Sequence, residues 1–400
     1  MLARLHRFLF TVLHRYTPIH SGIAGPPRHE IKGYQQVADY INKKDADHTQ
    51  HAYWKLEEAE HILPEPVQIF GEAQPQAAVT GGYRWTTEWL YLLPNTRFYV
   101  KPFCFVTQDD YLLSPVSHFH STYPRSNPAF RTWKLPKTRK LKGYAVVLRL
   151  GNVWYHNLTE GLPALLLLER AGISLTNIDH FIIGHSAGSM VYDWLKAWGI
   201  PSEKILLAGP RAAFLCEHLF IPTFQNRGGN WFAAPIAAKL GSRLPPPTLC
   251  WPQKIYISRQ RCNTPRLHNA AELLPLLLTF GYTTVLLEDL SLAEQIALFS
   301  QATHVMGVHG SGLANIIFCK PGTVVAELRT AWHANGHQQT YLDLAGYGRV
   351  QYYLLYTNKA VSTKTDKVAG VDQDADLVVE STLLEPLLIS MDKGQNKASS

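Results

Sequence analysis

The sequence has little cysteine and no long hydrophobic run. None of its 400 residues lies in a stretch that approaches the roughly 20 consecutive apolar residues of a transmembrane helix. The five cysteines are odd in number, scattered along the chain and never spaced as CxxC, which argues against a disulfide framework and against a zinc site. A reducing compartment suits such cysteines best, so we expect a cytoplasmic protein.

The sequence also lacks the patterns of nucleic-acid-binding proteins. It contains no basic run interleaved with aromatic residues, no zinc-finger spacing and no strand of the RNP type, and we expect no nucleic-acid partner. The formal charge of +7 still favours acidic partners such as nucleotides or anionic lipids. Hydrophobic residues make up 46% of the chain, enough for two domains with buried cores at this length.

The amino terminus carries a basic amphipathic pattern. On a helical projection, one face holds Leu2, Leu5, Leu9, Val12, Leu13 and Tyr16, and the other holds Arg4, Arg7 and Arg15. The apolar core FLFTVL is shorter than that of a usual signal peptide, and no small-residue cleavage site follows it. Two interpretations stay open: a helix in peripheral contact with an anionic membrane surface, or a helix packed on the protein itself.

Strand and helix patterns alternate through most of the chain after residue 144. Strands are predicted at 144–150, 179–183 and 204–208, with helices at 157–171 and 190–198. After a proline-rich linker at 243–252, strands are predicted at 254–258, 283–287 and 304–308, with helices at 269–280 and 292–302. A last strand and helix are predicted within 376–391, followed by a frayed tail. Such successions predict parallel sheets with Rossmann-like crossings, in which ligands bind at the carboxyl ends of the strands.

The turn His309-Gly310-Ser311-Gly312 has the features of an anion site. It follows the strand at 304–308 and opens a helix whose first amides lack intrahelical partners and carry the positive end of the helix dipole. The simpler alternative is an α/β turn in which the two glycines only permit unusual backbone angles.

Two arginines follow the strand at 254–258. Parallel-strand geometry would bring Arg259 and Arg266 toward the same anion, and a guanidinium fork suits phosphate. The alternative is a solvated surface pair.

A second motif, GHSAG at 184–188, follows a predicted strand and precedes a predicted helix. In that context G-x-S-x-G forms a nucleophile elbow, with Ser186 as the nucleophile of an α/β-hydrolase-type serine esterase. Asp289 with His309 or His337 would complete the triad order. No HGGG-type oxyanion segment precedes the serine, and the other interpretation is a tight strand-to-helix turn.

Several segments, in order, resemble family 61 glycosyltransferases, which include bacterial capsule and lipopolysaccharide enzymes, plant xylosyl- and arabinosyltransferases and O-linked GlcNAc transferases. The segments are RFYVKPFCFVTQDDYLLSPVS (97–117), NVWYHNLTEGLPALLLLERAGI (152–173), ISRxxxxxxRxxN (257–269), EDLSLAEQIALFSQA (288–302) and GVHGSGLANIIFCKPGTVVAEL (307–328). The resemblance covers roughly residues 60 to 355, which makes it more specific than any single motif. It departs from the family at Asn157, where an aromatic residue is usual, and a cleft that binds a saccharide without catalysis is therefore an alternative.

The resemblance implies an α/β fold of GT-B type, with two Rossmann-like domains facing each other across a cleft. We expect an amino-terminal amphipathic helix and polar segment over 1–60, an acceptor-side α/β domain with a β-hairpin region over 61–245, a nucleotide-sugar-binding Rossmann-like domain over 246–360, and a carboxyl-terminal segment with a frayed tail over 361–400.

The resemblance also implies a nucleotide-sugar donor as co-substrate, with no other cofactor. The donor ligands it implies are Arg259, Arg266, His309, Gly310, Ser311, Gly312, Asn315 and Glu327. The Glu327 carboxylate would accept a hydrogen bond from a ribose or sugar hydroxyl. We expect no metal site, because Asp109 and Asp110 stand in an apparent hairpin turn, where acidic residues are common, and no DxD-like pair occurs in a suitable loop.

The expected catalytic residues are His156 and Glu160. They stand at i and i+4, so that a helix would place both on one face. Glu160 matches the acidic position of the family's HWLxE pattern, which implies that it deprotonates a glycan hydroxyl while His156 orients it, although the two roles could be exchanged. The alternative is a capped helix start with a surface carboxylate. Direct displacement with one base implies inversion at the anomeric centre, and the resemblance implies a hexosyl- or pentosyltransferase of polysaccharide biosynthesis.

Overall fold

The structure is a computed structural model. It describes residues 27–47, 49–56, 67–71, 87–117, 135–184, 188–223, 232–243, 250–262, 267–330, 340–361 and 375–398. The predicted amino-terminal helix, Ser186, Arg266, His337 and most of the linker at 243–252 lie outside these residues. Among the described helices, none combines the length and the apolar character needed to span a bilayer.

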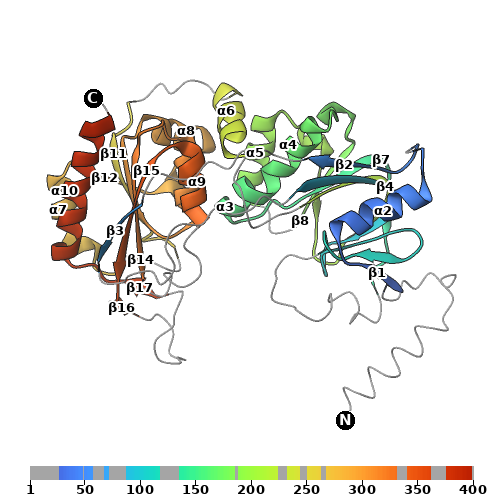
Figure 1. The fold of residues 1–400 in the computed structure, drawn as a ribbon, viewed down its shortest axis with the longest axis horizontal. Helices are drawn as coiled ribbons and strands as arrows, with labels where there is room; N and C mark the ends of the chain where they lie inside the picture. The colour runs from blue at the N-terminus through green and yellow to red at the C-terminus, as the bar shows by residue number, and fades with distance from the viewer. Residues whose placement is uncertain are drawn as a thin grey trace, which may run out of the picture. The chain divides into compact units, whose positions relative to one another are not determined.

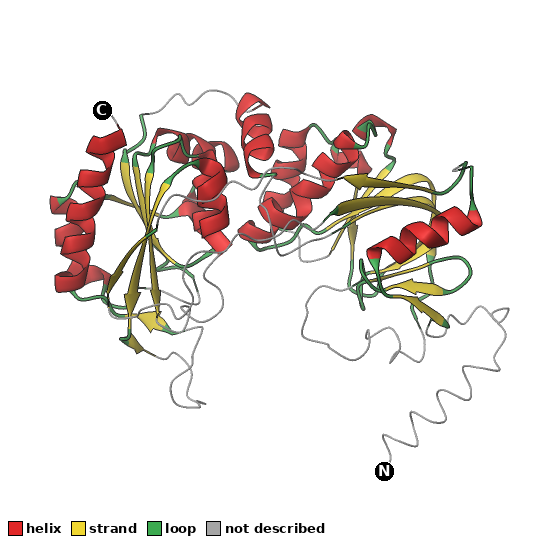
Figure 2. Cartoon of the chain, viewed as in Figure 1, coloured by secondary structure: helices red, strands yellow, loops and turns green. Residues whose placement is uncertain are grey.

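The chain divides into two compact units that alternate along the sequence. Unit 1 combines residues 1–58, 86–152 and 160–226, and unit 2 combines residues 59–85, 153–159 and 227–400. The predicted domains are contiguous ranges, whereas the compact units are each assembled from three segments. Each unit contains a sheet and helices, so the predicted α/β class is confirmed (Figure 2).

Unit 1 is built on a nine-stranded mixed sheet. Its strands are β1 (His29–Ile31), β2 (Ala52–Leu56), β4 (Glu88–Tyr99), β5 (Cys104–Val106), β6 (Tyr111–Leu113), β7 (Arg139–Leu148), β8 (His180–Gly184), β9 (Ile205–Ala208) and β10 (Ala213–Pro222), in the order β1-β6-β5-β4-β10-β7-β8-β9, with β2 also paired to β4. The strands β10, β7, β8 and β9 run parallel, as predicted for residues 144–208, whereas β4 is antiparallel to β10. The sheet is therefore a parallel Rossmann-like half joined to a mostly antiparallel half, in which β1 and β6 pair in parallel.

The described helices of unit 1 are α2 (Tyr34–Lys44), α4 (Leu162–Arg170) and α5 (Ser189–Trp198). The first is amphipathic and buries Val37, Ala38 and Ile41 against aromatic side chains of β4. The last ends at Gly199, whose φ of 88° is the left-handed conformation that glycine accepts without strain. Short 3₁₀ turns, Leu175–Asn177 and Ser202–Lys204, lead into the next strands.

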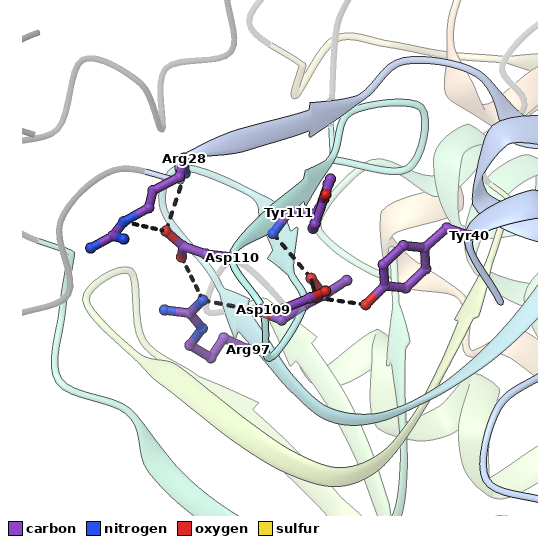
Figure 3. A network of polar contacts seen from close by, with 7 residues as sticks. Arg28, Tyr40, Arg97, Asp109, Asp110 and Tyr111 are labelled. Carbon is purple, nitrogen blue, oxygen red and sulfur yellow. Dashed lines mark hydrogen bonds and ion pairs between the residues drawn. The ribbon is translucent and has the colours of Figure 1, made fainter. Parts of the chain in front are cut away.

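Asp109 and Asp110 lie in the tight turn between the antiparallel strands β5 and β6, as predicted (Figure 3). Asp110 Oδ1 accepts a bond of 2.7 Å from Arg97 Nη2, and Asp109 Oδ1 accepts one of 2.6 Å from the Tyr40 hydroxyl. Burial raises the pKa of Asp109, but hydrogen bonds from Lys44, Tyr40 and Thr107 outweigh it and hold that pKa at about 2. Protein donors thus engage both carboxylates, and they tie the turn to α2 and β4.

Unit 2 is built on a six-stranded sheet in which every pair is parallel. The strands are β12 (Thr283–Val285), β11 (Lys254–Ile257), β13 (His304–Val308), β14 (Val324–Thr330), β15 (Gln351–Thr357) and β3 (Gln68–Gly71), in that order across the sheet. The parallel succession predicted from residue 254 onward is therefore confirmed. Strand β3 comes from far upstream and forms an edge that the sequence pattern did not indicate.

Helices cover both faces of this sheet (Figure 1). They are α6 (Ala233–Arg243), α7 (Ala270–Thr279), α8 (Leu292–Gln301), the 3₁₀ helix η7 (Ser311–Phe318), α9 (Thr340–Gly348) and α10 (Ser381–Ala398). An apolar core joins α7 and α10 to one face, with side chains such as Met306, Leu328 and Leu388. The intervening side chains of β14, Glu327 and Arg329, therefore point to the face that carries α9.

Two predicted details of unit 2 are wrong. The helix expected to follow the HGSG turn is a 3₁₀ helix that begins at Ser311, inside the turn. The tail predicted to be frayed continues α10 as far as Ala398. The tertiary contacts explain the longer helix, because Met391 is fully buried and Asp392 Oδ1 pairs with Lys254 Nζ at 2.8 Å.

Candidate functional site

The predicted anion site lies at the carboxyl ends of two neighbouring strands of unit 2. Strands β11 and β13 pair in parallel with Ile257 opposite Gly307, so Arg259 and His309 leave the sheet at the same edge. A Cβ atom on Gly310 would lie 1.9 Å from Arg259 Nη1, which shows that the guanidinium group rests directly against the glycine. The structure therefore brings Arg259 and the HGSG turn together, as expected from the strand order.

Gly310 serves close approach and not an unusual backbone conformation. Its φ of 169° is extended backbone that any residue adopts, so the alternative based on unusual backbone angles is wrong for this position. At Gly312 a Cβ atom would lie 2.8 Å from Leu287 Cδ1, which again indicates a packing constraint. Ser311, between them, is partly exposed and begins η7, and the Leu313 amide closes the turn on the Gly310 carbonyl at 3.0 Å.

His309 is the exposed end of a buried polar network. Its Nδ1 lies 2.5 Å from Glu327 Oε1, and the other carboxylate oxygen, Oε2, accepts a bond of 2.6 Å from the Tyr352 hydroxyl. Arg329 Nη2 lies 2.7 Å from the same Oε2 atom. The Glu327 and Arg329 side chains have no exposed surface, whereas 20% of the His309 side chain is exposed. We call these four residues the His309 network.

The charge state of Glu327 follows from its partners. Burial raises the pKa of Glu327, but the charge of Arg329, together with the hydrogen bond from His309, outweighs burial and holds that pKa at about 2. An ionised carboxylate only accepts hydrogen bonds, so His309 Nδ1 must carry the proton that it shares with Glu327. A ligand would therefore meet the ring through Nε2.

This geometry argues against the expected direct contact between Glu327 and a ribose or sugar hydroxyl. Both oxygens of Glu327 already accept from protein donors, and the side chain does not reach solvent. Its position behind His309 instead suits a residue that orients the imidazole. The signal in the sequence was the pair Glu327 and Arg329, two charges at i and i+2 in the mostly apolar strand β14.

Asn315 is likewise buried and engaged inside the protein. Its Oδ1 accepts from Trp154 Nε1 at 2.8 Å, and its Nδ2 donates to Gln295 Oε1 at 3.0 Å. Gln295 Nε2 in turn donates to the carbonyl of Leu287 at 2.9 Å. Asn315 therefore connects the helix start at Trp154 with η7 and α8, and this position favours a structural role over contact with the donor.

Aromatic rings connect His156 with the HGSG turn inside unit 2. His156 is the last residue of the short helix α3 (Trp154–His156), and its ring contacts that of Tyr155 with centroids 5.6 Å apart. Tyr155 contacts Tyr341 at 5.5 Å, and Tyr341 contacts His309 at 5.3 Å. Tyr341 follows no motif, so nothing in the sequence indicated its place beside His309.

Glu160 lies in the π-helical segment η3 (Asn157–Gly161) that follows α3. In a π-helix the backbone hydrogen bonds join residues i and i+5 instead of i and i+4. The α-helical geometry that would place His156 and Glu160 on one face therefore does not hold unchanged here. Gly161 is tightly placed, because a Cβ atom there would lie 2.8 Å from the Arg149 carbonyl oxygen. The surface carboxylate considered as the alternative is wrong, since the Glu160 side chain is only 2% exposed.

Glu160 faces a buried arginine of unit 1. Arg149 Nη1 lies 3.7 Å from Glu160 Oε2, and the Arg149 guanidinium lies over the Phe103 ring at 5.0 Å. Burial lowers the pKa of Arg149 to about 10, while the Glu160 carboxylate opposes that shift. The pair therefore gives unit 1 a buried carboxylate with a cation beside it.

The residues of the hydrolase alternative do not assemble in the described part of the chain. Asp289 pairs with Arg261 on the surface of unit 2, and His309 pairs with Glu327. Ser186 lies outside the described residues.

Comparisons with known proteins agree with the resemblance noted in the sequence. Residues 154–326 match the model of the family described as Glycosyltransferase 61. This range contains both expected catalytic residues, Arg259, Asn315 and the HGSG turn, and it ends just before Glu327. The match includes the GHSAG segment and lends no support to a hydrolase. No curated protein matches the chain.

Two similar solved structures are both of TibC. One is the crystal structure of the bacterial iron-containing dodecameric glycosyltransferase TibC from enterotoxigenic E. coli H10407, with 13% identity, 66% of this chain and 80% of that chain covered, and a TM-score of 0.28. The other is the dodecameric iron-containing heptosyltransferase TibC in complex with ADP-D-beta-D-heptose, with 11% identity, 67% and 79% of the two chains covered, and a TM-score of 0.29.

Proposed function

Because the chain is a glycosyltransferase whose residues 154–326 belong to family 61, we propose that it transfers a hexosyl or pentosyl group from a nucleotide-sugar donor to a hydroxyl of a glycan, free or linked to protein or lipid. Capsular polysaccharide or lipopolysaccharide biosynthesis is the proposed setting. The observation that carries the proposal is the Arg259 guanidinium held against Gly310 in the HGSG turn.

The donor site that we propose lies in unit 2. Arg259 and the amides that open η7 would bind the diphosphate of the donor, and they would neutralise the charge that develops as it leaves. Arg266 is proposed as a second cation on sequence grounds alone. Ser311 and His309, which are partly exposed, complete the proposed contacts. The buried side chains of Asn315 and Glu327 would hold the contacting residues in place without touching the donor.

The reaction that we propose is a single displacement. Glu160 accepts the proton of the acceptor hydroxyl as that oxygen attacks the anomeric carbon, and the bond from this carbon to the phosphate oxygen breaks with its electron pair. Attack from the side opposite the leaving group inverts the anomeric centre. His156 is proposed to orient Glu160 or the substrate, or to be the base itself. The proposed arrangement is of GT-B type, with the acceptor on the side of unit 1.

A screen of nucleotide sugars tests this function. UDP-, GDP-, ADP- and dTDP-linked sugars are added to the protein while its thermal unfolding is followed. The correct donor at about a hundred times its dissociation constant should stabilise the fold by about 2.7 kcal/mol. Transfer from that donor, with the product anomer assigned by NMR, then tests inversion. A retained anomer contradicts single displacement, and fluorophosphonate labelling that is lost on Ser186→Ala would favour the hydrolase.

Two substitutions should weaken donor binding through the same contact. Arg259→Ala should reduce the affinity for the nucleotide diphosphate by about 1.5–3 kcal/mol, because a charge-assisted bond is lost. Gly310→Ala should cause a similar loss, since the added Cβ would displace the guanidinium group. The double variant should lose little more than either single variant, because both remove one interaction. Calorimetric titration measures all three.

Gly241→Ala in α6 is the matched control for the glycine substitution, since a Cβ atom there meets nothing within 4 Å. It should bind nucleotide with unchanged affinity. Unchanged affinity in Arg259→Ala would remove Arg259 from the donor site.

A further inference from the structure

The His309 network fixes which ring nitrogen of His309 can meet a ligand. Glu327 is a fully buried, ionised carboxylate that accepts hydrogen bonds from His309 and Tyr352 and forms an ion pair with Arg329. The proton on Nδ1 is therefore committed to Glu327, and a ligand contact uses Nε2. The same ring is the part of the network that reaches the surface, directly beside Gly310.

A phosphate oxygen at neutral pH is an acceptor, so His309 Nε2 can bind it only as a donor. The imidazole must then carry protons on both nitrogens, that is, a positive charge. We propose that His309 binds the diphosphate of the donor as an imidazolium, and that the binding of a nucleotide diphosphate is accompanied by uptake of a proton at Nε2. This inference rests on the donor site proposed above. The proton comes from the buffer and forms the Nε2–H bond, and no other bond changes.

The charged groups around His309 make this uptake depend on the ligand. Glu327 and Arg329 on β14 carry opposite charges and form an ion pair, and Arg259 adds a cation beside the turn. A bound diphosphate neutralises Arg259 and attracts the imidazolium, so protonation and binding favour each other.

In the described part of unit 2, the tyrosines beside His309 and Glu327 are Tyr341 and Tyr352. Tyr352 on β15 and Tyr341 on α9 have pKa values well above the usual range, chiefly because of burial and then because of Glu327. Tyr155 on α3 contacts the Tyr341 ring, with centroids 5.5 Å apart. Both tyrosines stay neutral near neutral pH, so neither of them exchanges the proton that we assign to His309.

Calorimetric titration in buffers of different ionisation enthalpy tests the inference. UDP, GDP and ADP are titrated into the full-length protein slightly above neutral pH. The nucleotide diphosphate that binds should give a heat that rises linearly with buffer ionisation enthalpy, with a slope of a substantial fraction of one proton. His309→Gln should reduce this slope to near zero and weaken binding several-fold. His268→Gln, which changes an exposed histidine of the same unit, should keep the full slope.

The outcomes separate this inference from the proposed function. A nucleotide that binds with a slope of zero, or a slope that persists in His309→Gln, overturns the inference while the donor site stands. Failure of every nucleotide diphosphate to bind overturns the donor site and the inference together. A ¹⁵N spectrum of the histidine rings gives an independent check, because the free protein should show the Nδ1–H form of His309 and the complex should show both nitrogens protonated. An Nε2–H form in the free protein contradicts the assignment.

Discussion

Glu160→Gln should reduce turnover by about 10²–10⁴-fold while the affinity for the donor changes little, because glutamine keeps the shape of the side chain and cannot accept the proton. The measurement is the steady-state rate of transfer together with donor affinity from titration. Since Glu160 is also the partner of buried Arg149, the substitution leaves a buried cation without its carboxylate. The folded fraction of the variant must therefore be measured beside its activity.

Two further variants show whether the effect belongs to Glu160. Glu169→Gln, in α4 of the same helical region, removes a partly exposed carboxylate outside the proposed site and should keep normal turnover. His156→Ala should slow transfer less than Glu160→Gln if the histidine only orients the carboxylate. Normal turnover in Glu160→Gln with an inactive His156→Ala would make the histidine the base. Full activity in both variants would place the chemistry elsewhere.

Arg329→Met should lower the free energy of unfolding by about 3–5 kcal/mol near neutral pH. The reason is that the buried Glu327 carboxylate loses the arginine with which it forms an ion pair. Urea unfolding of the two proteins measures the difference. The double variant Arg329→Met/Glu327→Gln should recover part of the loss, since it removes the unpaired charge. Arg261→Met is the control, because Arg261 belongs to an exposed ion pair whose loss should cost less than about 1 kcal/mol.

The effect of Arg329→Met should depend on pH with a defined sign. The folded-state pKa of Glu327, about 2, lies below its ordinary value of 4.5. Its ionised form therefore contributes stability that is present above pH 4.5 and is lost as the pH falls toward 2. The difference between wild type and Arg329→Met should narrow over this acidic range. A constant difference would indicate lost packing instead of lost charge pairing.

The sequence predicted the parallel succession of unit 2 well because its periodicities are strong. The strand at 304–308 and the helix at 292–302 were placed within a residue of their observed bounds, and the capping box of Ser291 and Glu294 accounts for the sharp start of α8. The meeting of Arg259 with the HGSG turn followed from strand order alone. These features depend on local pattern and on a general rule of parallel sheets.

The sequence could not show which polar side chains form hydrogen bonds with other residues of the protein and are therefore not available to a ligand. Asn315 and Glu327 have the right chemistry for a ligand contact, but their partners Trp154, Gln295 and Tyr352 come from distant segments. Only the folded chain brings those donors and acceptors within hydrogen-bonding distance. The π-helical turn at Glu160 was hidden for a similar reason, because it accompanies the close contact of Gly161 with the Arg149 carbonyl.

Strand β3 has a practical consequence for handling the protein in pieces. Its residues pair with residues of β15 that lie 285 positions later in the sequence, and Gly71 at its end lies so close to the Tyr356 carbonyl that a Cβ atom would be 2.0 Å from that oxygen. A fragment starting at residue 227 would lack this strand. The backbone N–H and C=O groups of β15 that pair with β3 would then be unpaired at the edge of the sheet, where they could pair with another molecule. During synthesis, β3 must likewise wait for almost the whole chain, so unit 2 can complete its sheet only late.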